Sequence, residues 1–225
     1  MIVSCWSAKG GAGTTVVAVA LAVVLGRRTT GADIGSLLVD LQGDGPTVVG
    51  VPEPEGPGLA EWLVAASAVG PDAIGRLEHP VAEGVRMIPR GRRSLAGEER
   101  AALCRDRFID DPRPVVIDVG CLGRTDDEAE RVRRVMVEAS ATSLLVTRPC
   151  FIALRRALTL PVRPTGVVLV EEPGRALGRT DVEDVLGAPV VATVAVDAAV
   201  ARAVDAGLLA SRLPTGLGRS LRDVA

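Results

Sequence analysis

Short apolar runs recur along the chain, and segments with helical spacing lie between them. Most of these runs are continuously apolar and lack the two-residue alternation of a half-exposed strand, which is typical of parallel strands covered on both faces. Strands that alternate with helices predict an α/β fold with right-handed crossover connections. The predicted strands cover residues 2–6, 37–41, 85–88, 115–119, 143–147, 166–170 and 190–196.

Helix starts are predicted where a capping residue precedes apolar positions with helical spacing. The segments 125–128 and 180–183 both match the capping box, a Thr followed three residues later by a Glu. Asp197 can cap a third helix that ends near Gly207. The longest apolar run, 16–25, predicts a core helix or strand, because crossing a bilayer takes about 20 residues.

The strand–helix rhythm continues along the whole chain and predicts one domain over residues 1–225. We expect a mostly parallel, twisted sheet with helices on both faces. The Gly- and Pro-rich stretch 43–58 is interpreted as a long loop, not a linker, because the rhythm resumes after it. Hydrophobic residues make up 48% of the chain and aromatic residues only 2%, so the core must be aliphatic.

The charge balance argues against a dedicated nucleic-acid-binding protein. The formal net charge is −2, which gives no global basic field, and no DNA partner is expected. Two local groups of arginines are interpreted as solvated helix faces. They are Arg131, Arg133 and Arg134 in one group and Arg155 and Arg156 in the other.

Cysteine usage predicts a cytoplasmic protein with reduced thiols. The four cysteines form no CxxC pair, and we expect no secretory leader, since the first strand begins directly after Met1. The spacing of Cys121 and Cys150 gives little support for a metal or redox role. The single histidine, His79, precedes a proline in a predicted loop and needs no function.

The strongest chemical signal is the segment 8–15, A-K-G-G-A-G-T-T, between the first strand and an apolar helix. Glycines let backbone N–H groups wrap an anion, the helix N-terminus adds its positive dipole end, and Thr15 can ligate Mg²⁺. The loop departs from G-x-x-x-x-G-K-[ST] at Ala8 and at Thr14. The candidate nucleotide-binding residues here are Lys9, Gly10, Gly11, Ala12, Gly13, Thr14 and Thr15.

This loop resembles the deviant Walker A loop, K-G-G-x-G-K-[ST], of the MinD/ParA superfamily of P-loop ATPases. Lys9 matches the signature lysine, and Thr14 stands where the second lysine is expected. Lys9 is the only lysine among the 26 Lys and Arg residues, which indicates that this position needs a compact ammonium on a flexible stem. The resemblance implies ATP and Mg²⁺ as cofactors and makes Lys9 a catalytic candidate.

Acidic residues at two predicted strand ends extend the resemblance. Segment 115–118 resembles Walker B, which implies that Asp118 holds Mg²⁺ through water, together with Thr15. Segment 37–40 resembles the strand that ends in an Asp, here Asp40. The hydrolytic Asp of the superfamily lies two residues further on, where this chain has Gln42. Asp44 could supply a carboxylate instead, so Asp40 and Asp44 are the further catalytic candidates.

The base-binding part of the resemblance is less complete. The strand 167–170 resembles the one that ends in a base-reading Asn, but Glu171 follows it here. Segment 195–197 resembles the family's Pro–x–Asp segment, with Ala195 in place of the Pro. Glu171, Val196 and Asp197 are therefore the base-side candidates, and a Glu could accept from either adenine or guanine, which leaves the base open.

Within the superfamily the chain looks most like the CpaE/TadZ branch, which positions pilus and secretion machinery at cell poles. The resemblance implies a homodimer across the nucleotide, weak hydrolysis, a partner such as a pilus or secretion ATPase, and a pole or septum location reached through partners. The tail 217–225 is short and has two arginines, so no direct membrane binding is expected. The alternatives are a degenerate, non-hydrolysing scaffold and a ParA-like DNA partition ATPase.

Overall fold

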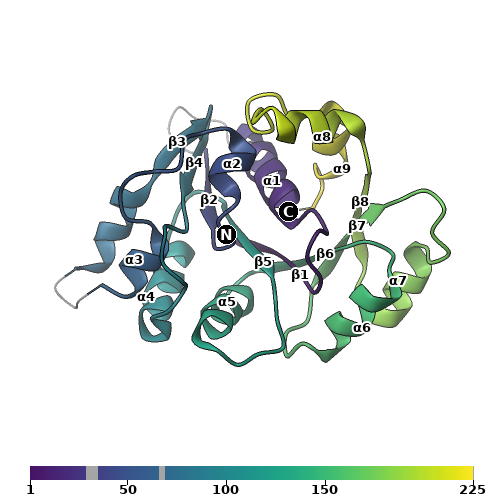
Figure 1. Ribbon diagram of the computed structural model, residues 1–225, viewed down its shortest axis with the longest axis horizontal. Helices are drawn as coiled ribbons and strands as arrows, with labels where there is room; N and C mark the ends of the chain where they lie inside the picture. The colour runs from purple at the N-terminus through teal and green to yellow at the C-terminus, as the bar shows by residue number, and fades with distance from the viewer. Residues whose placement is uncertain (29–34, 66–68, 225) are drawn as a thin grey trace.

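The computed structural model describes residues 1–28, 35–65 and 69–224 and contains one eight-stranded sheet. The strand order is β3-β4-β2-β5-β1-β6-β7-β8, and all neighbouring pairs are parallel except β3–β4 (Figure 1). The predicted fold class is therefore confirmed. The strands are β1 (Ile2–Ser7), β2 (Ser36–Asp40), β3 (His79–Ala82), β4 (Val85–Ile88), β5 (Val115–Cys121), β6 (Thr142–Thr147), β7 (Gly166–Glu171) and β8 (Val190–Ala195).

Helices cover both faces of the sheet, as Figure 1 shows. One face carries α1 (Thr14–Arg28), α2 (Gly45–Val49), α8 (Ala198–Asp205) and α9 (Thr215–Ser220). The other face carries α3 (Leu59–Leu63), α4 (Glu98–Ile109), α5 (Glu128–Glu138), α6 (Phe151–Thr159) and α7 (Arg179–Leu186), with a 3₁₀ turn, η1 (Pro71–Leu77), beside α4.

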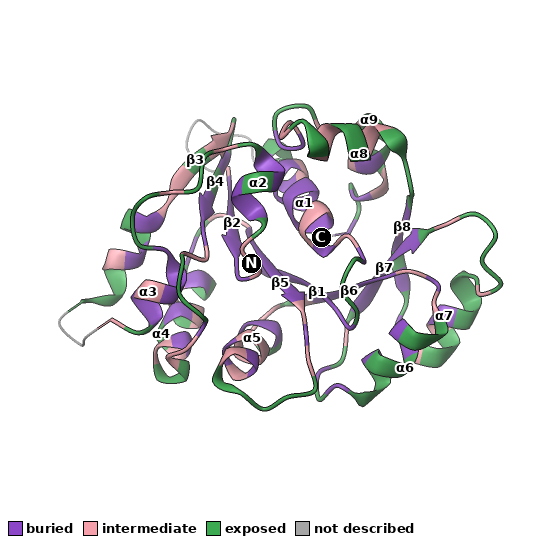
Figure 2. Ribbon diagram, viewed as in Figure 1, coloured by how far each residue is buried: buried purple, intermediate pink, exposed green. Residues whose placement is uncertain are grey.

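The core is aliphatic and is centred on the middle strands. All six residues of β1 are buried, and so is most of α1, as the purple ribbon in Figure 2 shows. The continuous apolar runs of the sequence follow from this burial on two faces. Trp6 is the one large aromatic residue in the central strand, and its Nε1 donates to Ser143 Oγ at 2.9 Å, which satisfies its buried N–H.

Two segments differ from the structure that the sequence predicted for them. His79 was placed in a loop, but it begins β3, the antiparallel edge strand, whose Pro80 obscures the strand pattern. The predicted loop 43–58 contains α2, because Pro46 presets helical φ at the helix start and Gly50 ends the helix at φ +76°. Gly50 also touches the backbone of Gly207 after α8: a Cβ on Gly50 would lie 1.8 Å from the Gly207 carbonyl oxygen.

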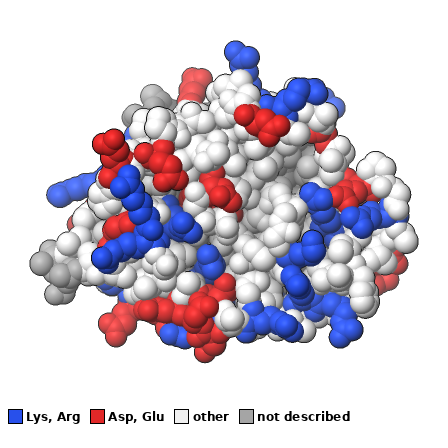
Figure 3. All heavy atoms as spheres, viewed as in Figure 1, with Lys and Arg blue, Asp and Glu red and all other residues white. Residues whose placement is uncertain are grey.

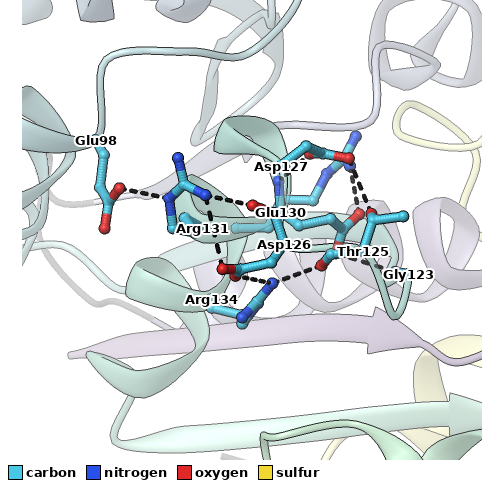
Figure 4. Close-up of polar contacts among 9 residues, drawn as sticks. Glu98, Gly123, Thr125, Asp126, Asp127, Glu130, Arg131 and Arg134 are labelled. Carbon is cyan, nitrogen blue, oxygen red and sulfur yellow. Dashed lines mark hydrogen bonds and ion pairs between the residues drawn. The ribbon is translucent and has the colours of Figure 1, made fainter.

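The helix caps agree with the sequence in one case of three. Asp197 accepts from the Ala199 N–H at 2.7 Å and caps α8 as predicted. In the other two boxes the expected Thr is not the cap. Asp127 caps α5 by accepting from the Glu130 N–H at 3.0 Å, while the Thr125 hydroxyl donates to Asp127 (Figure 4). The helix α7 begins at Arg179, one residue before the predicted cap.

The arginines of α5 are paired with carboxylates and form no free basic patch. Figure 4 shows Arg131 with Glu98, at 2.7 Å, and Arg134 with Asp126, at 3.0 Å. Arg133 pairs with Glu130 on the same helix. The Arg133 and Arg134 side chains are only 16% and 20% exposed, so the group is a paired, largely buried helix surface and not the solvated face that the sequence predicted.

Arg113 holds together the amino end of β5 and the start of β3. It donates to both Asp111 and Glu78 at 2.8–2.9 Å, and the three side chains are 16%, 4% and 12% exposed. Burial raises the pKa of each carboxyl, but the hydrogen bonds and charge of Arg113 outweigh it, so both pKa values are lowered. The stabilisation is therefore present at neutral pH and is lost as the pH falls through the lowered pKa values.

We expect Arg113→Gln to lower the free energy of unfolding at pH 7 by about 2 kcal/mol, because it leaves the buried Asp111 carboxylate without its paired cation and leaves Glu78 with only the Arg86 ion pair. Urea unfolding measures this. The matched control is Arg105→Gln, which removes an exposed ion pair with Asp106 and should change stability by less than about 0.5 kcal/mol. Equal losses in both variants would contradict the assignment.

Candidate nucleotide-binding site

The loop between β1 and α1 has an open glycine-lined surface. Gly11 and Gly13 have φ values of +77° and +90°, which L side chains rarely adopt. A Cβ placed on Gly10, Gly11 or Gly13 would meet no protein atom within 4 Å, so the loop leaves space in which a phosphate group fits. The helix α1 starts directly after the loop, at Thr14, with its N-terminus at the same edge of the sheet.

Lys9 lies exposed on this loop. Within the described parts of the chain, its ammonium makes no hydrogen bond or ion pair. Sequence reasoning missed one neighbour, Cys150 at the start of α6. Hydrogen bonding from the Ala153 N–H lowers the pKa of the Cys150 thiol, and the charge of Lys9 lowers it further. The loop lysine and the β6–α6 connection therefore lie close together.

Asp118 is the buried carboxylate of the site. It is 1% exposed, and its Oδ1 accepts from the Gly120 N–H at 3.1 Å, while Oδ2 has no hydrogen-bond partner among the described residues. Burial and the nearby charge of Asp40 raise its pKa to about 7, although the Thr15 hydroxyl and Gly120 lower it. A buried, unpartnered carboxylate oxygen beside a hydroxyl is the donor set that suits a hydrated Mg²⁺.

Thr15 and Asp118 therefore fit the predicted metal site. Among residues 1–28, 35–65 and 69–224 no group of three or more His, Cys, Asp and Glu side chains could cage a metal ion. In many phosphate sites Mg²⁺ is held by one or two protein groups, water and phosphate oxygens, and Thr15 and Asp118 would be the protein groups here.

Asp40 lies opposite Asp118 on the neighbouring strand β2. Its side chain is fully buried and accepts three backbone N–H groups, from Gln42 at 2.9 Å, Gly43 at 2.6 Å and Gly45 at 3.0 Å. Burial raises its pKa overall, although these bonds oppose the shift. Asp40 was a catalytic candidate, but this geometry favours a structural role in which it holds the turn after β2. Both of its carboxylate oxygens already accept hydrogen bonds from the backbone.

The turn held by Asp40 carries Gln42 and Asp44. Asp44 is exposed, makes no side-chain cap to α2, and lies near enough to raise the pKa of Asp118. It is thus the free carboxylate of this turn. Arg90 donates from Nη1 to the Gln42 carbonyl at 2.9 Å and packs over Gly43, and no sequence pattern selects it.

The three base-side candidates meet at the ends of β7 and β8. Glu171 pairs in register with Ala195, and its carbonyl accepts from the Val196 N–H at 3.1 Å. Glu171 and Val196 are exposed, whereas the Asp197 carboxylate is used to cap α8. Glu171 ends β7, and Val196 and Asp197 follow β8. These two strands lie beyond β6 from the phosphate loop and on the opposite side of β1 from Asp118.

A comparison of the sequence with protein-family models gave no match, and a comparison with curated proteins gave none either. Solved structures match over nearly the whole chain. A ParA family ATPase from Chlorobium tepidum has a TM-score of 0.77 at 19% identity, covering 99% of this chain and 96% of that chain. The chain has the MinD/ParA fold.

Two further structures show the same fold. MinD from Pyrococcus horikoshii, complexed with Mg-ADP, has a TM-score of 0.72 at 16% identity, covering 99% of this chain and 93% of that one. The MinC:MinD complex from Aquifex aeolicus matches with a TM-score of 0.75 at 14% identity, with coverage of 99% and 93%. At these identities the likeness establishes the MinD/ParA fold of the chain, and the function is argued from its own residues.

Proposed function

We propose that the chain binds ATP and Mg²⁺, dimerises across the nucleotide and acts as a positioning switch with slow hydrolysis. The observation that carries the proposal is Lys9: the only lysine of the chain, exposed on an open phosphate loop, with no partner among the described residues. A lysine without a partner among the described residues of its own subunit is available for the phosphates bound by a second subunit.

The phosphate and metal parts of the proposal rest on complementary geometry. The glycine loop offers N–H groups and a helix N-terminus, and Asp118 offers the unpartnered oxygen beside Thr15. ATP is the proposed nucleotide because a similar fold, that of MinD, was solved with Mg-ADP. Weak hydrolysis is proposed because Thr14 and Gln42 stand where the superfamily has a lysine and a carboxylate.

The surface supports self-association and protein partners better than DNA. In the view of Figure 3, basic side chains gather on the right, over α6 and α7, and acidic ones along the lower left, over α4 and α5. A surface that carries both basic and acidic regions attracts the phosphates of duplex DNA less than a continuous basic surface would. At the start of α6, Phe151 and Ile152 are 64% and 53% exposed, among arginine side chains.

We extend the proposal to a cytoplasmic protein that reaches a cell pole or septum through a partner, such as a pilus or secretion ATPase, as the CpaE/TadZ resemblance implies. No described helix is both long and apolar enough for a membrane span. Leu217 and Leu221 of the tail are 3% and 0% exposed and pack into the core, which supports the expectation of no direct membrane binding.

The test is sedimentation velocity on the chain with Mg²⁺ and ATP, ADP or no nucleotide. We expect a dimer with ATP and mostly monomer otherwise. If nucleotide neither binds nor changes the sedimentation coefficient, the degenerate scaffold is the better interpretation. If ATP produces DNA binding that weakens steeply with added salt, the partition ATPase is the better one.

A further inference from the structure

Gln42 is the only residue of the chain with a side-chain carboxamide: there is no other glutamine and no asparagine among the 225 residues. It occupies the position where the superfamily pattern would place a hydrolytic carboxylate. In a chain otherwise devoid of side-chain amides, an amide at this position indicates a chemical requirement for one.

The backbone of Gln42 is held from two sides. Its N–H donates to Asp40 Oδ1 at 2.9 Å, and its carbonyl accepts from Arg90 at 2.9 Å. The Arg90 guanidinium packs over Gly43, where a Cβ would come within 2.8 Å of Cζ. The direction in which the Gln42 side chain leaves the turn is therefore fixed by buried and half-buried contacts.

The side chain of Gln42 lies over Gly120, two residues after Asp118. A Cβ on Gly120 would be 2.0 Å from Gln42 Oε1, so in this conformation the amide lies directly against the glycine. The Gly120 N–H donates to Asp118, which interacts with Thr15 at the start of α1. The amide thus lies at the same edge as the predicted magnesium ligands. Within the described residues, neither its Oε1 nor its Nε2 has a hydrogen-bond partner.

We infer that Gln42 orients the attacking water in nucleotide hydrolysis. This inference rests on the proposed function and names the residue on which its slow turnover depends. In phosphoryl transfer the water oxygen bonds to the γ-phosphorus as the bond to the β–γ bridging oxygen breaks; the electron pair leaves with the diphosphate, and the water proton passes to the released phosphate. Such a loose transition state needs the water placed more than it needs a strong base, and in GTPases of the Ras type a glutamine places it.

The amide is suited to this work because Oε1 can accept from the water while Nε2 donates to a phosphate oxygen. The amide also adds no negative charge beside Asp40, Asp44 and Asp118. A further carboxylate there would repel these three and make the ionised form of each less favourable. Arg90 contacts the Gln42 carbonyl and acts on hydrolysis through Gln42, so it is a positioning residue. Gly120 positions both the Gln42 amide and, through its N–H, Asp118.

The experiment compares wild type with Gln42→Ala and Gln42→Met in single-turnover hydrolysis of γ-labelled ATP with Mg²⁺. Methionine keeps the length of the side chain over Gly120 without its hydrogen-bonding groups. We expect both variants to hydrolyse about 100-fold more slowly, with ATP affinity and ATP-induced dimerisation within twofold of wild type. Thr47→Ala, an exposed change in the neighbouring α2, is the matched control and should hydrolyse at the wild-type rate.

The outcomes separate this inference from the proposed function. If wild type binds no ATP, the proposed function fails and the inference falls with it. If wild type binds ATP and dimerises but both Gln42 variants hydrolyse at its rate, the inference alone is overturned. Binding and dimerisation with no hydrolysis by wild type over days would also overturn it. Loss of hydrolysis in both variants with unchanged thermal unfolding would support it.

Discussion

Lys9→Ala should lower ATP affinity and abolish the dimer that ATP induces, while thermal unfolding of the nucleotide-free chain stays unchanged. Thr14 occupies the place of the second lysine, so each subunit offers the β- and γ-phosphates only N–H groups, a helix dipole and Mg²⁺. A charge-assisted contact from the partner's loop lysine contributes about 1.5–3 kcal/mol. Its loss corresponds to roughly 10- to 150-fold in affinity, and binding and dimerisation should weaken by the same coupling factor.

Lys9→Arg should not restore the dimer, because a planar guanidinium is bulkier and differently hydrated than an ammonium. Sedimentation velocity with ATP, ADP and no nucleotide measures this for wild type and both variants. Arg212→Ala removes an exposed cation elsewhere and serves as the control. An ATP-induced dimer of Lys9→Ala as stable as that of wild type would show that the lysine does not reach across the interface.

Asp118→Asn should have opposite effects on stability and function. In the nucleotide-free chain Asp118 is buried, has an unpartnered oxygen and lies beside Asp40, so its negative charge is costly. Removing the charge should raise the free energy of unfolding at pH 8 by about 1–3 kcal/mol. The same variant should lose Mg²⁺-dependent ATP binding, because the carboxylate that holds the hydrated ion is gone.

The pH dependence gives a second measure of the same charge. The pKa of Asp118, about 7 in the folded chain, lies above the ordinary value, so the folded state binds this proton more tightly than the unfolded state. Stability of the nucleotide-free wild type should therefore fall as the pH rises through 7, and Asp118→Asn should lack this fall. Thermal unfolding in EDTA at pH 6 and pH 8 tests it. Parallel pH profiles for the two proteins would contradict the assignment.

The parallel sheet could be predicted from the sequence because a strand that is buried on both faces is made mostly of consecutive apolar residues. Most parallel strands contain a continuous apolar run, and the phosphate loop is marked by glycines that the backbone geometry requires. The edge strand β3 leaves no such trace, since Pro80 and partial exposure remove both its apolar run and its alternation. The cap of α5 was misplaced by two residues because Thr125 and Asp127 both satisfy the local pattern.

Candidate site residues could be selected from the sequence where one local segment carries them, but not where segments distant in the sequence meet. The loop residues 9–15 and Asp118 could be selected from spacing and strand ends. Arg90 contacts the carbonyl of Gln42, which lies 48 positions away in the sequence, and no local sequence pattern predicts such a contact. The role of Asp40 was also beyond the sequence, because a strand-end carboxylate that binds three N–H groups has the same spacing as one that faces a ligand.

The short strand β3 has a consequence for how copies of this chain can aggregate. An open edge of a sheet presents free N–H and C=O groups to which another chain can add a strand. At this edge the outermost strand has only four residues, and the exposed Pro80 has no N–H to offer. The addition of further strands at the β3 edge, and with it the growth of fibrils by sheet extension, is therefore disfavoured.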